Sequence, residues 1–441
     1  MNTPNGNPPS HRMMQARRHL SRGVRHAEKG DYRRAIREFD MAVHLNPKHV
    51  EAYNNRGNAY QDKGDHNRAF ADYGKAIELD PNFAPAYYNR GRAHFIKGDY
   101  YQAIQDSDDA IELNPNYALA YVSRGAAYSK KGDYDRAIAD LDKAIELNPN
   151  YAEHYSNRGT AHDEKGDYDR AISDYDLAIK LNPNHADAYY NRGNTYLHNG
   201  DTDHAVSDYD RAIELNPNHA EAYSNRGKIS RDKGAYDCAT ADFDKAIQID
   251  PNDAAAYYNR GLAYFMKSDY DHAIQDYDRS LDINPNEAAT YGNRGMAHVL
   301  KGDYNRAISD FDMAIEIRPD HAMLYLIRGI YPSVSDDGVA LDDFDSAVRL
   351  CPNYESDFID RKFIHTVKGV VEHAIAFLEQ VIASPPESAD DFYYLGIKSL
   401  YQNDRLSARD CFTLAERKGF EDTDKLRQHQ ENLNSVRWLP R

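Results

Sequence analysis

The stretch AEHYSNRGTAHDEKGDYDRAISDYDLAIKLNPNH, residues 152–185, decides the fold of this chain of 441 residues. Two segments with apolar residues at helical spacing flank Gly166 and Asp167. A glycine at this point can take the left-handed conformation that ends one helix, and Asp167 can cap the next helix. Pro183 lacks an N–H and ends the second helix before the pattern starts again. The stretch therefore predicts two helices joined by a tight turn.

The same pattern recurs every 34 residues along most of the chain. One helix pair is too small to bury its own apolar face, so neighbouring pairs must stack to form a core. The pattern therefore predicts an all-α protein built as an α-solenoid. Alanine and proline keep step with a glycine that marks the period at Gly23, Gly57, Gly91, Gly125, Gly159, Gly193, Gly227, Gly261, Gly295 and Gly329.

These repeats resemble the tetratricopeptide repeat (TPR) family, which has 34-residue helix–turn–helix units with glycine, alanine and proline at these positions. The Asn-Arg-Gly triplet of most repeats is similar to that of bacterial-type members. The resemblance implies a right-handed α-solenoid superhelix of about twelve units. The tenth unit, 322–354, has Pro332 inside its first helix, which we therefore expect to be kinked or partly unwound. The predicted organisation is a flexible N-terminal segment at 1–15, nine regular repeats at 16–321, three divergent repeats at 322–422 and a capping helix at 423–441.

The charge distribution narrows the range of partners. The net charge is −17, but residues 1–50 carry +6, which leaves −23 on the rest of the chain. An acidic body argues against phosphate-dominated binding of nucleic acid. The basic start could contact an acidic partner or acidic parts of its own chain. With no apolar run long enough for a membrane helix and no signal-peptide core, the chain is expected to be cytoplasmic and to have no membrane partner.

The sequence contains no recognisable catalytic or cofactor motif. Phosphate-binding glycine loops, zinc-protease and nucleophile-elbow patterns and paired cysteines are all missing. Most histidines follow the repeat, which favours core packing over metal ligation. We therefore predict no enzyme activity, no cofactor and no metal.

An arginine precedes each of these glycines, where the family usually has an apolar residue. An acidic residue follows sixteen positions later in nine repeats, as in the pair Arg158 and Asp174. We interpret these residues as a structural ladder of ion pairs between helices. The alternative is a row of arginines that binds a polyanion.

In the family, the first helix of each unit lines a concave groove, and carrying this over assigns two sets of groove residues. The first set is the asparagine before the arginine, whose carboxamide can pair with an extended peptide backbone. The alternative for these asparagines is a local polar contact between helices. They are Asn55, Asn89, Asn157, Asn191, Asn225, Asn259 and Asn293.

The second set is apolar and differs from repeat to repeat, so it is where side-chain specificity would lie. Methionine and aromatic residues at these places resemble an adaptable peptide-binding surface. The alternative is that the irregular C-terminal repeats cover them. The residues are Tyr88, Phe95, Tyr258, Leu262, Phe265, Met266, Met296, Leu300 and Leu326.

Three functions remain open on the sequence. The first is a non-enzymatic scaffold that binds an extended peptide or partner segment in the groove. The second is an adaptor or regulatory subunit that docks a folded protein through the irregular C-terminal repeats. The third is a structural protein that assembles head to tail as a homo-oligomer.

Overall fold

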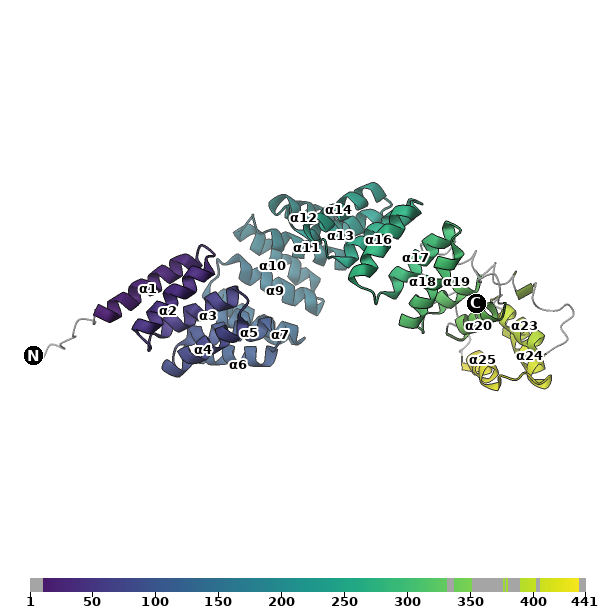
Figure 1. Cartoon of the computed structure of the whole chain (residues 1–441), viewed down its shortest axis with the longest axis horizontal. Helices are drawn as coiled ribbons and strands as arrows, with labels where there is room; N and C mark the ends of the chain where they lie inside the picture. Colours follow the sequence, from purple (N-terminus) through teal and green to yellow (C-terminus); the bar gives the residue numbers. More distant parts are fainter. Residues whose placement is uncertain are drawn as a thin grey trace, which may run out of the picture. The chain divides into compact units, whose positions relative to one another are not determined.

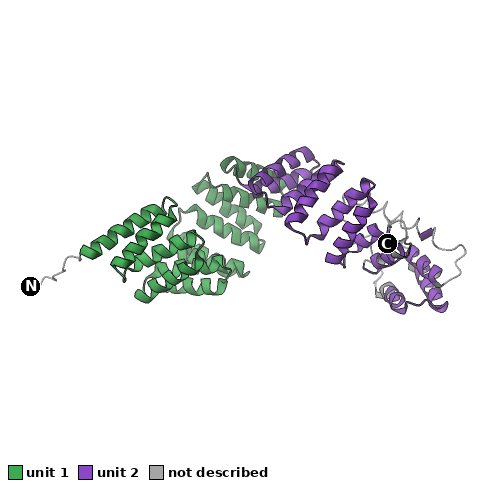
Figure 2. Ribbon diagram, viewed as in Figure 1, with its two compact units in different colours: residues 1–218 green, residues 219–441 purple. Residues whose placement is uncertain are grey.

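The computed structural model describes residues 11–330, 337–350, 376, 378–379, 389–401 and 405–435, and within these ranges every regular element is an α-helix. The predicted all-α fold is therefore confirmed. The chain divides into two compact units, residues 1–218 and residues 219–441, which we call the N-terminal and C-terminal units (Figure 2). Repeats are numbered from residues 16–49, which form repeat 1.

In each unit, consecutive helices form antiparallel pairs that stack on one another (Figure 1). The helices of the N-terminal unit are α1 (His11–Ala27), α2 (Tyr32–Leu45), α3 (Val50–Asp62), α4 (His66–Leu79), α5 (Ala84–Ile96), α6 (Tyr100–Leu113), α7 (Ala118–Lys130), α8 (Tyr134–Leu147), α9 (Ala152–Lys165), α10 (Tyr168–Leu181), α11 (Ala186–His198) and α12 (Thr202–Leu215).

The C-terminal unit continues the same alternation and then becomes irregular. Its helices are α13 (Ala220–Asp232), α14 (Tyr236–Ile249), α15 (Ala254–Met266), α16 (Tyr270–Ile283), α17 (Ala288–Leu300), α18 (Tyr304–Ile317), α19 (Ala322–Ile330), α20 (Asp337–Leu350), α23 (Ala389–Tyr401), α24 (Arg405–Arg417) and α25 (Thr423–Ser435).

The turn inside each repeat is set by two neighbouring residues. Gly166 has φ +85°, in the left-handed region, and the corresponding glycines of most other repeats also have positive φ. The aspartate after it precedes the second helix, and in most repeats its carboxylate accepts a hydrogen bond from a backbone N–H of the first turn, as Asp133 does from Arg136 at 3.2 Å. Asp167 occupies the N-cap position but makes no such side-chain bond, so the predicted cap is formed in most other repeats and not at Asp167 itself.

Repeat 8 departs from this turn, because Ser268 occupies the glycine position at φ +63°. A side chain in this conformation is strained by about 1–2 kcal/mol. We expect Ser268→Gly to raise the free energy of unfolding by about 1 kcal/mol, measured by chemical denaturation. The matched control is Gly302→Ser in repeat 9, where φ is +79°, and it should lose a similar amount. Equal stability of all three proteins would contradict the strain.

The signature glycine lets the two helices of a repeat approach closely. A Cβ at Gly159 would lie 2.9 Å from the ring of Tyr175, which is only 1% exposed. Ala171 and Ala178 are fully buried on the same second helix. The glycine of the first helix therefore receives an aromatic ring from the second helix, beside two buried alanines, and this contact is the core of a regular repeat.

The boundaries at the two ends differ in part from the prediction. Helix α1 begins at His11, so residues 11–15 are helical and the predicted flexible segment 1–15 is too long. The physical reason is that Arg12, Met13, Met14 and Gln15 are good helix formers. Residues 1–10 lie outside the described residues.

The irregular repeats are described in part. Helix α19 is described as far as Ile330, and Pro332, where we expect a kink, lies outside the described residues. Most of the predicted repeat at 355–388 also lies outside them. Helices α23 and α24 pair within the predicted repeat at 389–422, and α25 lies within the range predicted for the capping helix.

Candidate functional site

From repeat 2 onward, the arginine before the signature glycine is held by carboxylates. Arg158 donates from Nε and Nη2 to Asp174, at 2.8 and 2.5 Å, and from Nη1 to Asp142 of the preceding repeat at 2.6 Å. Its guanidinium also lies 5.7 Å from the ring centroid of Tyr155. The same two-pronged pairing with the repeat's own aspartate is made by Arg56, Arg90, Arg124, Arg192, Arg226, Arg260, Arg294 and Arg328.

The ladder is therefore confirmed as a set of contacts except at repeat 1, where Glu38 pairs with His19 at 2.7 Å and not with Arg22. In the later repeats it is wider than predicted. The sequence reasoning found an acidic residue sixteen positions after nine of the arginines. It missed Asp343, which lies fifteen residues after Arg328, and the aspartate sixteen residues before most of the arginines, which links consecutive repeats. The missed signal was the second acidic column of the period. Those links join Arg56 to Asp40, Arg124 to Asp108, Arg158 to Asp142, Arg192 to Asp176, Arg260 to Asp244, Arg294 to Asp278 and Arg328 to Asp312.

Burial has the largest effect on the pKa of several aspartates in this ladder. It raises the pKa of the Asp72, Asp140 and Asp276 carboxyls, although each faces an arginine. The hydrogen bonds to Asp72 raise the pKa of Arg56 in turn. An arginine already bound to one or two carboxylates offers little charge to a ligand, so the ladder favours a structural role over polyanion binding.

In the N-terminal unit, the predicted groove asparagines fall into two groups. Asn89 is 9% exposed, and its Nδ2 donates to Oδ1 of Asn54 in the preceding repeat at 2.9 Å. Asn55, Asn157 and Asn191 make no side-chain hydrogen bond to any part of the chain that the structure describes. Asn157 is exposed and the other two are half-buried. The alternative interpretation, a local polar contact between helices, is therefore correct for Asn89. The carboxamides of the other three asparagines remain available to a ligand.

In the C-terminal unit the predicted asparagines are occupied within the protein. Asn259 accepts a hydrogen bond from Arg231 at 2.5 Å and donates to the carbonyl of Ala255 at 2.7 Å. Asn293 donates to the hydroxyl of Tyr258 at 3.0 Å. Asn225 accepts from Nζ of Lys228 at 3.2 Å. The carboxamides of these three asparagines therefore already have hydrogen-bond partners within the chain.

The predicted apolar residues of the N-terminal unit are half-buried. The ring of Tyr88 lies 5.2 Å from that of Tyr117, and burial raises the pKa of Tyr117 to about 12. Phe95 packs against Tyr100 at 5.5 Å between ring centroids. Beside them, Ile96 is 55% exposed, the largest open apolar side chain of this repeat's first helix.

The predicted apolar strip of the C-terminal unit is only partly open. Met266 and Leu300, which are 34 residues apart, are 45% and 49% exposed. Tyr258, Leu262, Phe265 and Met296 are half-buried; Phe265 packs on Tyr270 at 5.5 Å, and Met296 packs against the main apolar core.

The assignment of Leu326 to the groove is wrong. Leu326 is 1% exposed and belongs to the apolar core that also contains Phe311, Phe344, Leu378 and Tyr393. Helix α19 packs with the helices before and after it, so apolar side chains such as Leu326 are enclosed. The 34-residue period does not show which later helices pack against this repeat, so it could not show that Leu326 is buried.

A hydroxyl that the sequence reasoning did not single out lies beneath this strip. In repeats 2 and 6, the second-helix tyrosine donates from its hydroxyl to an asparagine of the first helix, as Tyr209 does to Asn194 at 2.7 Å. In repeat 8 the corresponding residues are Tyr277 and Leu262, and the buried Tyr277 hydroxyl has no hydrogen-bond partner among the described residues. Burial raises the pKa of Tyr277.

We expect Tyr277→Phe to keep or raise the free energy of unfolding, by up to about 1 kcal/mol, because the variant loses no hydrogen bond. Tyr209→Phe should instead lose about 0.5–1.5 kcal/mol, since it leaves Asn194 without its donor. Both values come from chemical denaturation followed by circular dichroism. Equal losses in the two variants would show that Tyr277 has a partner in solution.

Other kinds of site receive no support from the described residues. Across residues 11–330 and the later described ranges, no group of three or more histidine, cysteine or acidic residues could hold a metal ion. Burial lowers the pKa of the periodic histidines His94, His162 and His298, as expected for packed side chains. None of the described helices combines the length and apolar character that crossing a membrane requires.

Comparisons with known families agree with the repeat pattern. Matches described as "Tetratricopeptide repeat" cover residues 50–83, 118–151, 186–219, 254–287 and 288–321, and also 73–105 and 141–173. Matches described as "TPR repeat" cover residues 23–64, 91–132, 163–200 and 227–268. Among curated proteins, none matches the chain.

Several solved structures are similar to parts of the chain. YrrB, described as a TPR protein with an unusual peptide-binding site, is 30% identical, with 42% of this chain and 95% of that chain covered and a TM-score of 0.34. A tetratricopeptide repeat protein from Parabacteroides merdae is 21% identical over 57% and 99% of the two chains, with a TM-score of 0.48. Yeast Tom70 is 18% identical over 95% and 94%, with a TM-score of 0.38.

Proposed function

The chain belongs to the tetratricopeptide repeat family, and from that premise we propose that it is a non-enzymatic protein-interaction scaffold that binds an extended peptide. The peptide would lie along the first helices of the repeats, over the positions that the structure leaves open in each compact unit. Each unit would offer its own contacts: the C-terminal unit would hold apolar side chains of a bound peptide, and the free carboxamides of the N-terminal unit would pair with the backbone of a peptide bound there.

The observation that supports this proposal most is the exposure of Met266 and Leu300. They occupy the same position of consecutive first helices, and each is close to half exposed, whereas the other large apolar residues of these two helices are buried or half-buried. Half-buried Leu262 and Phe265 lie on the same helix as Met266. Adjacent exposed methionine and leucine side chains form an adaptable surface for an apolar anchor residue.

The free carboxamides support the backbone part of the proposal. Asn157 and Asn191 are 34 residues apart, and each offers both a donor and an acceptor. An extended peptide presents its own donors and acceptors whatever its sequence, so such contacts add affinity without adding specificity. Specificity would then come from the apolar positions.

The test is selection of peptides from a library of random dodecapeptides, followed by calorimetry on individual synthetic peptides. We expect wild type to enrich peptides with a large apolar residue, and the Met266→Ser, Leu300→Ser double variant to lose about tenfold or more in affinity for them. The helix content of the variant should not change, because both side chains are already exposed.

The matched control replaces two exposed methionines that lie on second helices. Met41 and Met313 are 44% and 38% exposed, and the Met41→Ser, Met313→Ser variant should bind the selected peptides as wild type does. Equal affinity in both double variants would move the peptide away from the first helices and refute the proposal.

A further inference from the structure

A second surface, on the turn between the two helices of repeat 1, differs from its counterparts in a way that points to a ligand. In later repeats, the lysine that ends a first helix reaches back to an aspartate at the start of the preceding second helix. Lys165 bonds to Asp135 at 2.6 Å and Lys267 bonds to Asp237 at 2.5 Å. Lys301 pairs with Asp271 in the same way. These bonds pair opposite charges across neighbouring repeats.

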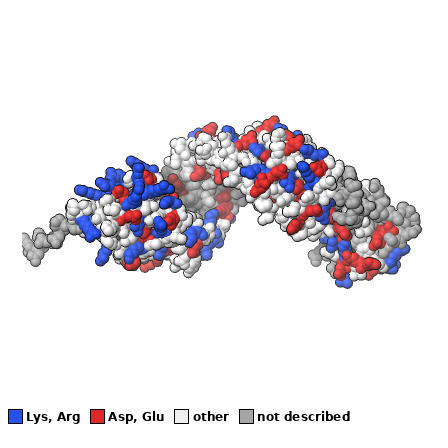
Figure 3. Space-filling model, viewed as in Figure 1, with Lys and Arg blue, Asp and Glu red and all other residues white. Residues whose placement is uncertain are grey.

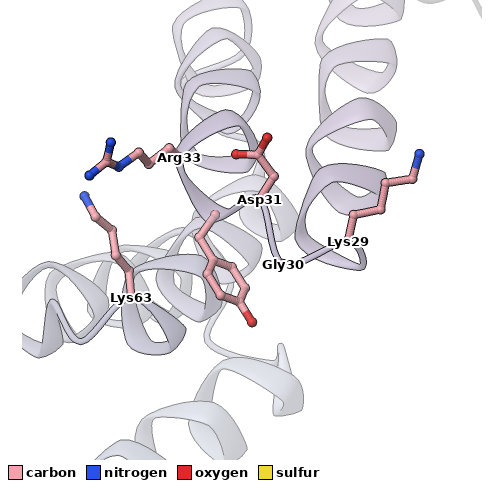
Figure 4. Close-up of a pocket in the computed structure, with 6 residues that line it drawn as sticks. Lys29, Gly30, Asp31, Arg33 and Lys63 are labelled. Atoms are coloured by element: carbon pink, nitrogen blue, oxygen red, sulfur yellow. The ribbon is translucent and has the colours of Figure 1, made fainter.

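At the start of the array the same two positions carry like charges. The residue opposite Lys63, thirty residues earlier, is Arg33 instead of an aspartate. Both side chains are exposed, and both line a notch of about 510 Å³ together with Lys29, Gly30, Asp31 and Tyr32. Figure 4 shows Arg33 and Lys63 extending toward the same side of this notch.

None of the three basic side chains at the notch is neutralised. The side chains of Lys29, Arg33 and Lys63 make no hydrogen bond or ion pair with any residue in the described part of the chain. The one carboxylate that lines the notch, Asp31, is already engaged by Arg34, through the backbone N–H at 3.1 Å and through Nε at 3.3 Å. The notch therefore presents three cations and no free anion.

Other basic residues of repeat 1 add to the positive charge of the notch. Arg18 and Arg25 are exposed on α1, at positions where repeat 2 has the buried alanines Ala52 and Ala59. Figure 3 shows Lys and Arg gathered over the first helices, whereas the rest of the chain is acidic. An anionic partner would be attracted to repeat 1 and repelled elsewhere, which fixes where it binds.

We propose that Arg33 and Lys63, with Lys29 on the opposite side of the notch, form a binding site for the side-chain carboxylates of an acidic polypeptide. A carboxylate between Arg33 and Lys63 takes the place that Asp135 takes beside Lys165 in the later repeats. The Lys–Asp pairs of the later repeats show the geometry of this contact, and in each of them the partner of the lysine is a carboxylate. The body of the protein is too acidic to favour the long polyphosphate of a nucleic acid. This site is separate from the first-helix surface and does not depend on it.

The test uses a fluorescein-labelled octa-aspartate peptide and fluorescence anisotropy at low ionic strength. Wild type should bind it with an affinity that falls steeply as salt is added, and an octa-asparagine peptide should not bind. Arg33→Asp should weaken binding by about tenfold or more, because it restores the Lys63–carboxylate pair within the chain and fills the site from inside.

Two further variants make the test specific. Arg170→Asp makes the same charge change in the first turn of α10, at an arginine that is 71% exposed and far along the chain, and should bind as wild type does. Asp135→Arg places an arginine opposite Lys165, recreating the like-charged pair in repeats 4 and 5, and should add a second binding site per chain. The expected stoichiometry therefore rises from one peptide to two.

Three results would overturn the proposal. One is the absence of octa-aspartate binding to wild type at low ionic strength. Another is equal binding by the Arg33→Asp and Arg170→Asp variants, which would mean that only net charge matters. The third is tighter, Arg33-dependent binding of a single-stranded oligonucleotide than of octa-aspartate, which would make the ligand a nucleic acid.

Discussion

Arg158→Met is expected to lower the free energy of unfolding by about 3 kcal/mol, the usual cost of removing one partner of a buried ion pair. Asp174 is 4% exposed, and without Arg158 its charge has neither water nor a cation. The variant also breaks the bond to Asp142, so the interface between repeats 4 and 5 loosens with it. The measurement is urea denaturation followed by circular dichroism, with hydrogen exchange to locate the loss around these repeats.

Two controls separate the ladder from a general loss of charge. Arg170→Met removes an exposed arginine whose one ion pair with the described residues is a surface contact with Asp167, and it should cost less than about 0.5 kcal/mol. Arg158→Met combined with Asp174→Leu should recover most of the loss, because the unpaired buried charge is gone. Unchanged unfolding of the single variant would show that the ladder contributes nothing to stability.

Gly57→Ala should lose about 1–3 kcal/mol, as overpacked cores do. The added Cβ would lie 2.6 Å from Cε1 and 2.8 Å from Cδ1 of Tyr73, a ring that is 1% exposed and has no room to move. Either the ring or the helix must shift, which separates α3 from α4. The change is measured by the same denaturation experiment.

The chain provides its own control in repeat 3, where the aromatic ring is replaced by Ser107. A Cβ at Gly91 would meet Asp106 Cβ at 3.1 Å and Ser107 Oγ at 3.6 Å, with no ring in the way. Alanine gains about 1 kcal/mol of helix propensity over glycine, which offsets this tight contact, so Gly91→Ala should be near neutral. Equal losses at Gly57 and Gly91 would mean that the ring contact is not what requires glycine.

Much of the candidate site could not be read from the repeat period. The period identified which residues share a position, so it found the arginine ladder and the exposed Met266 and Leu300. It did not show that Asn259 is occupied by Arg231 while Asn157 is free, because that depends on which side chains neighbouring repeats bring within reach. The like-charged pair of Arg33 and Lys63 could have been found by comparing equivalent positions between repeats, because the position of Arg33 is occupied by an aspartate, such as Asp135, in several later repeats.

By itself the sequence determined the helices, their turns and the stacking of repeats. A turn glycine, a capping aspartate and a terminating proline act through local backbone geometry, and the 34-residue period repeats these local decisions. Only the tertiary structure decided that Leu326 is buried and that the hydroxyl of Tyr277 has no partner among the described residues. The reason is physical: burial and hydrogen bonding depend on atoms that neighbouring helices bring together, and these differ among repeats that share one pattern.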